Sequence, residues 1–200
     1  PTHPQIRLVR QAVALLRAGG VIVYPTDSCY ALGCGLDAFD AAARIRAIRG
    51  IDDRHHLTLV CHDLAPAGRY ARLDNWQFRI LRLGVPGSYT FLLPATREVP
   101  RRVKHPRRST IGVRVPDHPV AAALVAELGE PILSSSLILP GESTPLNEPD
   151  AIAAAVGRRI DAFLDAGPCA GEPSTVVDLE SAPGSVVRVG RGDPAALGLD

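Results

Sequence analysis

Three short polar side chains, Thr26, Asp27 and Ser28, follow an apolar segment over residues 21–24. Pro25 lies between the two and cannot donate a hydrogen bond to a sheet ladder, so we expect a strand to end there. In open α/β sheets ligands bind at strand ends, which makes these side chains candidates for ligand contacts. The same residue types also build strand-terminating turns through local hydrogen bonds, and the segment alone leaves both interpretations open.

Arg114 is the strongest candidate for binding an anion. It lies in a predicted strand in which Val113 and Val115 occupy the opposite face. An inward-pointing charge is costly unless it meets an anion or a carboxylate. The planar guanidinium fork suits phosphate, and a structural ion pair with an Asp or Glu of the same chain is the alternative.

A basic run lies shortly before Arg114, although the formal net charge of the 200 residues is only +1. Glu98 is the single acid within it. The run is either a solvated loop or a phosphate-contacting patch, and the sequence does not separate the two. Its members are Arg97, Arg101, Arg102, Lys104, Arg107 and Arg108.

The four cysteines have no CxxC spacing, so we expect reduced and mostly buried thiols. Cys29 is the one expected to be exposed, because it lies in the candidate ligand-binding turn. The histidines lack the acid spacing of a zinc site. Asp52 and Asp53 could help to hold magnesium, although adjacent acids more often begin a solvated turn. Neither GxxxxGK[ST] nor GxSxG occurs, which argues against a P-loop and an α/β-hydrolase.

Helical and strand patterns alternate, which predicts an α/β fold: one domain over residues 1–200, with helices packed on a twisted, open, mixed sheet. Asp37 or Asp40 is expected to cap the second helix. Helices are predicted over 5–18, 38–49, 63–83 (two short helices broken near Asp74), 119–128 and 148–156. Strands are predicted over 21–24, 57–61, 89–93, 110–115, 131–133 (a strand edge), 160–164, 174–179 and 186–189.

No apolar run of membrane-spanning length and no N-terminal signal pattern is evident, so a cytoplasmic protein without membrane association is expected. Residues 140–149 are rich in Pro, Gly, Ser and Thr, which indicates the clearest flexible connection.

Five segments, in order, resemble the motifs of the YrdC-like family, the threonylcarbamoyl-adenylate synthases. PTDSCYAL resembles PTDTxYGL, and AIRGIDDRHHLTLVC resembles the helix-loop-strand with the basic KxR element. PGSYTFLL, TIGVRVPDHP and PSTVVDL resemble PGPxTxxL, TVAVRVPDHP and PSTVVDL. The resemblance covers roughly residues 10–192, and the variants PTDSxYAL, TFLL and LSSSLxLPG look most like the YciO branch.

The resemblance implies a YrdC-like α/β fold and a pocket for ATP, AMP or an acyl-adenylate, with magnesium as a companion of the nucleotide and no tightly bound cofactor. Thr26, Tyr30 and Thr58 would line the threonine or carbamoyl part, and Arg114 would hold phosphate. The remaining residues implied to bind nucleotide or substrate are Arg49, Ser134, Ser136, Ser174, Thr175 and Arg188. For Arg188 a surface position on an edge strand is an equal alternative, and for the serines a polar strand end.

Two positions depart from the family pattern. The second basic position of KxR falls on Ile51, and the asparagine of SxN falls on Ile138. Arg54 or His55 in the following loop is an alternative source of the lost charge. A site with less positive charge binds triphosphate less well than monophosphate. We therefore rank hydrolysis of threonylcarbamoyl-AMP above its synthesis from ATP, threonine and bicarbonate for tRNA modification. The family fold is also associated with binding double-stranded RNA or tRNA, so a non-catalytic RNA-binding module, using the basic run, is a further alternative.

Overall fold

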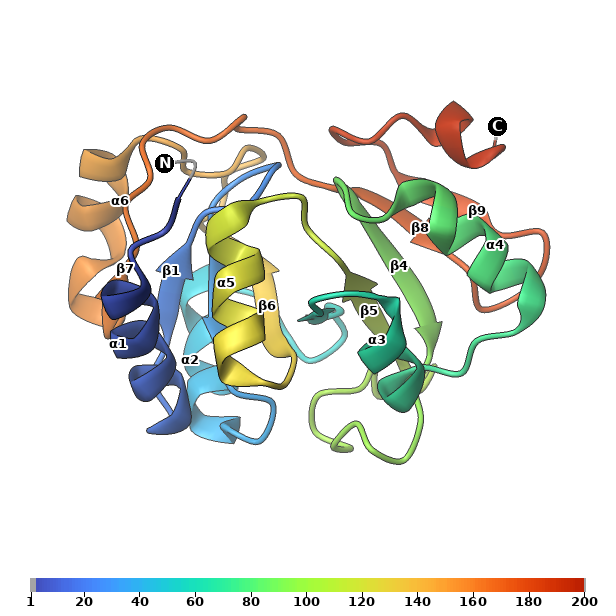
Figure 1. Ribbon diagram of the computed structural model, residues 1–200, viewed down its shortest axis with the longest axis horizontal. Helices are drawn as coiled ribbons and strands as arrows, with labels where there is room; N and C mark the ends of the chain where they lie inside the picture. The colour runs from blue at the N-terminus through green and yellow to red at the C-terminus, as the bar shows by residue number, and fades with distance from the viewer. Residues whose placement is uncertain (1–2, 200) are drawn as a thin grey trace.

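The computed structural model describes residues 3–199, in which nine strands form one mixed sheet with helices on both of its faces (Figure 1). The predicted α/β fold with a mixed sheet is confirmed. The strands are β1 (Ile22–Tyr24), β2 (Ala31–Cys34), β3 (Thr58–Val60), β4 (Tyr89–Pro94), β5 (Thr110–Arg114), β6 (Ile132–Ser136), β7 (Ala162–Phe163), β8 (Thr175–Asp178) and β9 (Ser185–Arg188).

The spatial order of the strands is β7-β1-β2-β6-β3-β5-β4-β8-β9. Three pairs are parallel: β1 with β7, β3 with β5, and β4 with β8. The other neighbours are antiparallel. The helices are α1 (Ile6–Arg17), α2 (Phe39–Arg49), α3 (Leu64–Tyr70), α4 (Asn75–Gly84), α5 (Pro119–Leu128), α6 (Pro149–Val156), and the 3-10 turns η1 (Gly157–Arg159) and η2 (Pro194–Leu197).

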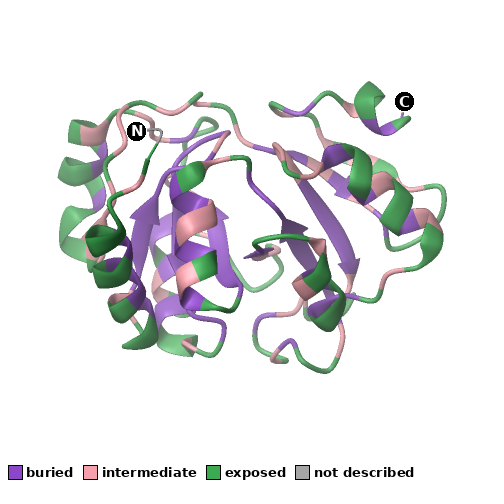
Figure 2. Cartoon of the chain, in the orientation of Figure 1, coloured by how far each residue is buried: buried purple, intermediate pink, exposed green. Residues whose placement is uncertain are grey.

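Both faces of the central strands are buried, because successive residues of a strand belong to different hydrophobic clusters. Val23 joins the cluster that includes residues of α2, α3, α4 and α6, whereas its neighbour Tyr24 joins the cluster of α1 and α5. In Figure 2 the strands β1, β2 and β5 are buried throughout, whereas the edge strands β7 and β9 are intermediate or exposed; the outer faces of the helices are exposed. The result is a three-layer arrangement typical of α/β proteins.

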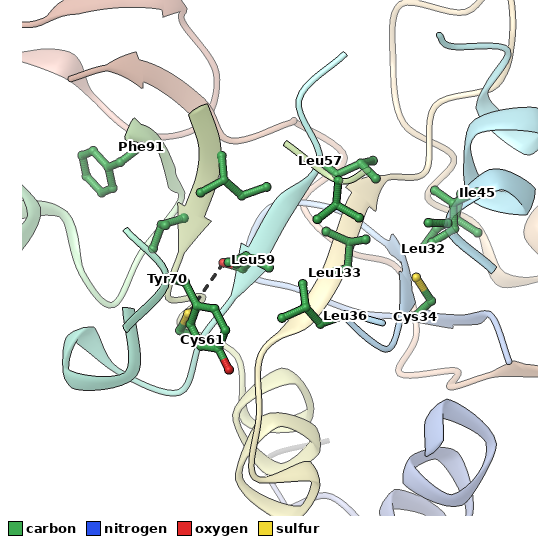
Figure 3. Packing of buried hydrophobic residues seen from close by; sticks show 14 of the residues in the cluster. Leu32, Cys34, Leu36, Ile45, Leu57, Leu59, Cys61, Tyr70, Phe91 and Leu133 are labelled. Atoms are coloured by element: carbon green, nitrogen blue, oxygen red, sulfur yellow. Dashed lines mark hydrogen bonds between the residues drawn. The ribbon is translucent and has the colours of Figure 1, made fainter. Parts of the chain in front are cut away.

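The centre of the larger cluster is built from leucines of adjacent strands (Figure 3). Leu59 of β3 pairs in register with Leu133 of β6, and both are fully buried. Burying a leucine side chain contributes about 1.5–3 kcal/mol to stability. This packing fixes the relative position of β3 and β6, whose ends carry Thr58 and Ser136.

Helix α5 shows how the sequence sets local structure. Its N-cap His118 accepts a hydrogen bond at Nδ1 from the N–H of Val120, and Pro119 occupies the first helical position. Gly129 ends the helix with a φ of 78°, in the left-handed region where glycine has no steric penalty. The predicted bounds, 119–128, are confirmed.

Three sequence-based expectations are wrong. The strand β2 was not expected, because Ala31–Cys34 is short, contains Gly33 and is buried without alternation. The segment at 131–133 is not a strand edge: β6 is an interior strand that extends to Ser136, since Ser134 pairs with both β2 and β3, and Ser135 and Ser136 pair with β2. Helix α2 has Ala38 at its N-cap with no side-chain cap, so neither Asp37 nor Asp40 has that role.

Among the described residues, no helix combines the length and the apolar character needed to cross a membrane.

Candidate functional site

A cavity of about 280 Å³ lies against the ends of several strands and against one face of β4, where Thr90 and Leu92 line it. Thr58 begins β3, Ser136 ends β6 and Arg188 ends β9, while Ser174 directly precedes β8. The complete lining is Arg49, Arg54, His55, His56, Thr58, Thr90, Leu92, Ser135, Ser136, Ser174, Val176, Val187 and Arg188. The cavity therefore combines basic groups, hydroxyls and an apolar wall.

Two arginines of this cavity carry positive charge that no described carboxylate neutralises within ion-pairing distance. Arg49, at the C-terminus of α2, is 9% exposed. It donates from Nε to the carbonyl of Ile138 at 2.9 Å and from Nη1 to Ser135 Oγ at 2.5 Å. Arg188 donates from Nη2 to the carbonyl of Ser174 at 2.7 Å, and its Nε is buried without a partner.

Desolvation and neighbouring positive charge destabilise the charged form of both guanidiniums. Desolvation and the positive charge of Arg188 lower the pKa of Arg49 to about 10. Desolvation also lowers the pKa of Arg188, and the charge of Arg114 adds to this effect. Concentrated positive charge with spare donor capacity is the condition under which an anion binds.

Hydroxyl groups form another part of the cavity wall. Thr90 Oγ1 and Ser174 Oγ share a hydrogen bond of 2.8 Å. Gly112 of β5 makes room for this arrangement, because a Cβ there would lie 2.7 Å from Thr58 Oγ1 and 3.2 Å from Thr90 Cγ2. Each hydroxyl can donate to a phosphate oxygen.

The turn after β1 forms a second polar region, which lies outside this cavity lining. Arg114, 5% exposed, donates from Nη2 to Asp27 Oδ1 at 2.6 Å and lies 3.4 Å from Thr26 Oγ1. Ser88 donates to the other oxygen of Asp27. Thr26 itself donates to the carbonyl of Cys29 at 2.6 Å. The structural ion pair and the strand-terminating turn, both left open by the sequence, are thus present.

Three further predicted site residues use their hydroxyls within the fold. Tyr30 donates to the carbonyl of Gly167 at 2.7 Å. Ser134 donates to the carbonyl of Leu32 and also contacts the Tyr24 hydroxyl. Thr175 donates to the carbonyl of Gly192. None of the three belongs to the cavity lining, whereas Arg49, Thr58, Ser136, Ser174 and Arg188 do.

Ser135 and His56 line the cavity but were not among the predicted site residues. His55, which the sequence indicated only as a substitute for the lost basic position, also lines it. The strand period could have indicated Ser135, which shares a face of β6 with Leu133. The histidines lie in the loop between α2 and β3, directly after the KxR-like element. Nothing in the sequence pattern marks which way a loop side chain points.

The expectation that Cys29 is exposed is wrong, because its side chain is fully buried beneath the turn. Cys169 is the partly exposed cysteine, and all four cysteines are free. Among residues 3–199, no three His, Cys, Asp or Glu side chains come together in a group that could hold a metal ion.

The basic run lies in the loop between β4 and β5, where buried Val99 and Val103 anchor it. Arg108 pairs with Asp178 and Glu180, two acids that are distant in sequence. Lys104 donates to the carbonyl of Thr96. The remaining members, which are exposed and have no ion pair with a described residue, are Arg97, Arg101, Arg102 and Arg107.

The mixed sheet and the cavity at its strand ends define a class of α/β proteins. The family model described as telomere recombination, Sua5_yciO_yrdC, matches residues 14–190. The chain therefore belongs to the Sua5/YciO/YrdC family, as the motifs predicted.

Individual relatives agree with this assignment. YciO of Escherichia coli K12 is 47% identical over 193 residues, which cover 96% of this chain and 94% of the relative. The threonylcarbamoyl-AMP synthase of Halorhodospira halophila is 38% identical over 157 residues, covering 78% of this chain and 81% of the relative.

Solved structures match as well. The crystal structure of Escherichia coli YciO superposes with a TM-score of 0.96 at 46% identity, and the match covers 98% of this chain and 96% of that chain. Sua5 of P. abyssi complexed with L-threonine superposes with a TM-score of 0.85 at 26% identity, covering 93% of this chain and 55% of that chain.

Proposed function

We propose that the cavity binds the AMP part of an acyl-adenylate and that the protein hydrolyses threonylcarbamoyl-AMP. The observation that carries the proposal is the pair of arginines, Arg49 and Arg188, which face a hydroxyl-lined cavity without a described carboxylate partner. The relatives named threonylcarbamoyl-AMP synthases supply the identity of the acyl-adenylate.

The composition of the lining suits a nucleoside monophosphate. Phosphate oxygens accept hydrogen bonds from guanidinium and hydroxyl groups, and Arg188 has a buried Nε free to donate. Leu92, Val176 and Val187 provide an apolar surface for a base. Val187 is 58% exposed without a ligand, so a base that covers it would gain hydrophobic stabilisation.

Hydrolysis is favoured over synthesis because two polar positions of the family pattern are apolar here. Ile51 packs against the larger hydrophobic cluster, and Ile138 is 9% exposed. Arg49 moreover already donates hydrogen bonds to the Ile138 carbonyl and to Ser135 Oγ. Fewer free cations lower the affinity for a triphosphate more than for a monophosphate. Synthesis from ATP with magnesium, threonine and bicarbonate is the competing function.

The test is incubation of the purified protein with preformed threonylcarbamoyl-AMP, with release of AMP followed against a protein-free control. We expect faster release than in the control, at least about tenfold slower release in Arg188→Ala because a charge-assisted contact is lost, and no change in Arg158→Ala. Arg158 is the matched control because it is an exposed arginine of η1. Absence of any acceleration would refute hydrolysis. Formation of threonylcarbamoyl-AMP at the rate of a true synthase would support the competing function.

A second candidate function is binding of double-stranded RNA or tRNA by the loop between β4 and β5. It is favoured by the four exposed arginines there that have no described carboxylate partner. Each phosphate contact adds about 0.9 to the slope of log affinity against log salt. We expect Arg101→Ala/Arg107→Ala to lower this slope by about 2, and Arg108→Ala, whose guanidinium is already paired, to lower it less. No measurable RNA binding at low salt would contradict this function.

A further inference from the structure

His55 lies in the cavity wall with a ring that the fold does not use. Its backbone N–H donates to the carbonyl of Asp52, which holds the loop, but no described residue makes a hydrogen bond to its imidazole nitrogens. The residue is accessible to solvent on one side and covered by the cavity wall on the other, so its ring can exchange protons with solvent while it lines the ligand site.

The neighbouring His56 is different, although it also lines the cavity. Its Nε2 shares a hydrogen bond of 2.7 Å with Thr110 Oγ1. Its ring stacks on His105, with a centroid distance of 4.6 Å. A ring fixed by both a hydrogen bond and a stacking partner is a structural element, which leaves His55 as the free imidazole of the site.

The charges that act on His55 come from three directions. Arg46 and Arg49 of α2 and Arg188 of β9 are positive, and Asp52 of the same loop is negative. Desolvation together with the positive charges lowers the pKa of His55 to about 4. The imidazole is therefore neutral at pH 7 and can accept a proton, but so low a pKa makes it a weak base.

We propose that His55 is the general base that activates water for hydrolysis of the bound acyl-adenylate, and that the phosphate of the substrate itself strengthens this base. The proposal rests on the proposed function. A phosphate held by Arg49 and Arg188 neutralises the two charges that oppose protonation of His55. A negative charge added close to a histidine raises its pKa. The base is then strongest when the substrate is in place.

The reaction balances without a further reactant. His55 removes a proton from water while the water oxygen attacks the carbamoyl carbon of the mixed anhydride. The bond between that carbon and the phosphate oxygen breaks, and its electron pair leaves with AMP. The carbamate that forms releases carbon dioxide and threonine, and protonated His55 returns its proton to solvent. AMP is a good leaving group because the two arginines stabilise the negative charge that develops on its phosphate as the bond breaks.

The first experiment measures AMP release from preformed threonylcarbamoyl-AMP as a function of pH. In the wild type we expect the acid limb of kcat/KM, which reports the free protein, at lower pH than the acid limb of kcat, which reports the complex. His55→Asn should lower kcat by about 10²–10⁴-fold and abolish that limb, with AMP affinity unchanged. His62→Asn, an exposed histidine outside the site, should behave as the wild type.

The second experiment follows the imidazole resonances of the protein by NMR, with His55 assigned by its loss in His55→Asn. AMP at saturation should raise the pKa of His55 by at least about one unit, and should do so much less in Arg188→Ala. An unchanged pKa on AMP binding overturns the strengthening of the base.

The outcomes separate the two proposals. A wild-type protein that binds AMP but does not accelerate hydrolysis overturns the proposed function and the role of His55 together. A wild type that hydrolyses the adenylate while His55→Asn does so equally fast overturns only the role of His55.

Discussion

The region around Arg114 and the region around Arg49 and Arg188 differ in how the charge of the arginines is neutralised. Around Arg114 the charge is balanced, since Asp27 accepts its guanidinium and Ser88 donates to the same carboxylate. Around Arg49 and Arg188 the charge is unbalanced, and desolvation lowers the pKa of both. Arg114 matches a family motif and yet serves the fold through its ion pair with Asp27. The arginines available to a ligand are Arg49 and Arg188, which have no counterion among the described residues.

The largest expected effect concerns the balanced region. Arg114→Ala leaves Asp27 as a buried carboxylate without a counterion, so we expect the free energy of unfolding to fall by about 3–5 kcal/mol. The side chains of Arg114 and Asp27 are only 6% and 12% exposed, which keeps the pair out of solvent. Urea unfolding measures the loss.

The matched control is Arg108→Ala, whose ion pairs are more exposed and whose removal should cost about 0–1 kcal/mol. In Asp27→Asn/Arg114→Gln both charges are removed, and most of the stability should return. Equal losses in the free energy of unfolding for Arg114→Ala and Arg108→Ala would contradict the claim that the buried ion pair matters more for stability than the exposed one.

A pH effect of intermediate size is expected from His56. Desolvation, with the positive charges of His105 and Arg108, lowers the pKa of His56 from its ordinary 6.5 to about 4. Between these two values the unfolded chain binds more protons than the folded one, so stability falls as pH is lowered below about 6.5, by up to about 2 kcal/mol at pH 5.

His56→Gln should reduce this dependence when the free energy of unfolding is measured at pH 7 and pH 5. His62→Gln, at an exposed position, serves as the control. A wild type that is equally stable at both pH values would contradict the effect.

The smallest expected effects come from two adjacent serines of β6. Ser134 has two hydrogen bonds inside the fold, with Tyr24 and Leu32, so Ser134→Ala should cost about 0.5–1.5 kcal/mol of stability and leave AMP affinity unchanged. Ser135 lines the cavity and contacts Arg49. Ser135→Ala should weaken AMP binding by about 3–10-fold, with a smaller loss of stability. Calorimetric titration of AMP with both variants separates these roles, and identical behaviour of the two would contradict it.

Periodicity and turn chemistry predicted most of the elements, because each depends on a few adjacent residues. The helix over 119–128 has Pro119 at its start and Gly129 at its end, and both signals are local. The strand β2 was missed because Gly33 has low strand propensity, and β6 was predicted too short because three successive serines have no apolar alternation. β2 and β6 are strands because they pair with each other, and a contact between two segments so distant in sequence is a feature of the tertiary structure.

The site was predicted less completely for the same reason. The motif resemblance indicated Arg49, Ser174 and Arg188, which do line the cavity. It could not indicate that Asp27 would pair with Arg114, because these residues are 87 positions apart in sequence. Nor could it indicate the free ring of His55, since the orientation of a loop side chain depends on what packs around it.

The most direct test of the contrast between the two regions is calorimetric titration of AMP into the wild type, Arg188→Ala and the charge-neutral Asp27→Asn/Arg114→Gln. The unbalanced arginines should hold the phosphate, so the dissociation constant should rise by about 10–100-fold in Arg188→Ala and stay near the wild-type value in the double variant. The reverse result, with normal AMP binding by Arg188→Ala and none by the double variant, would place the phosphate on Arg114 and contradict the account.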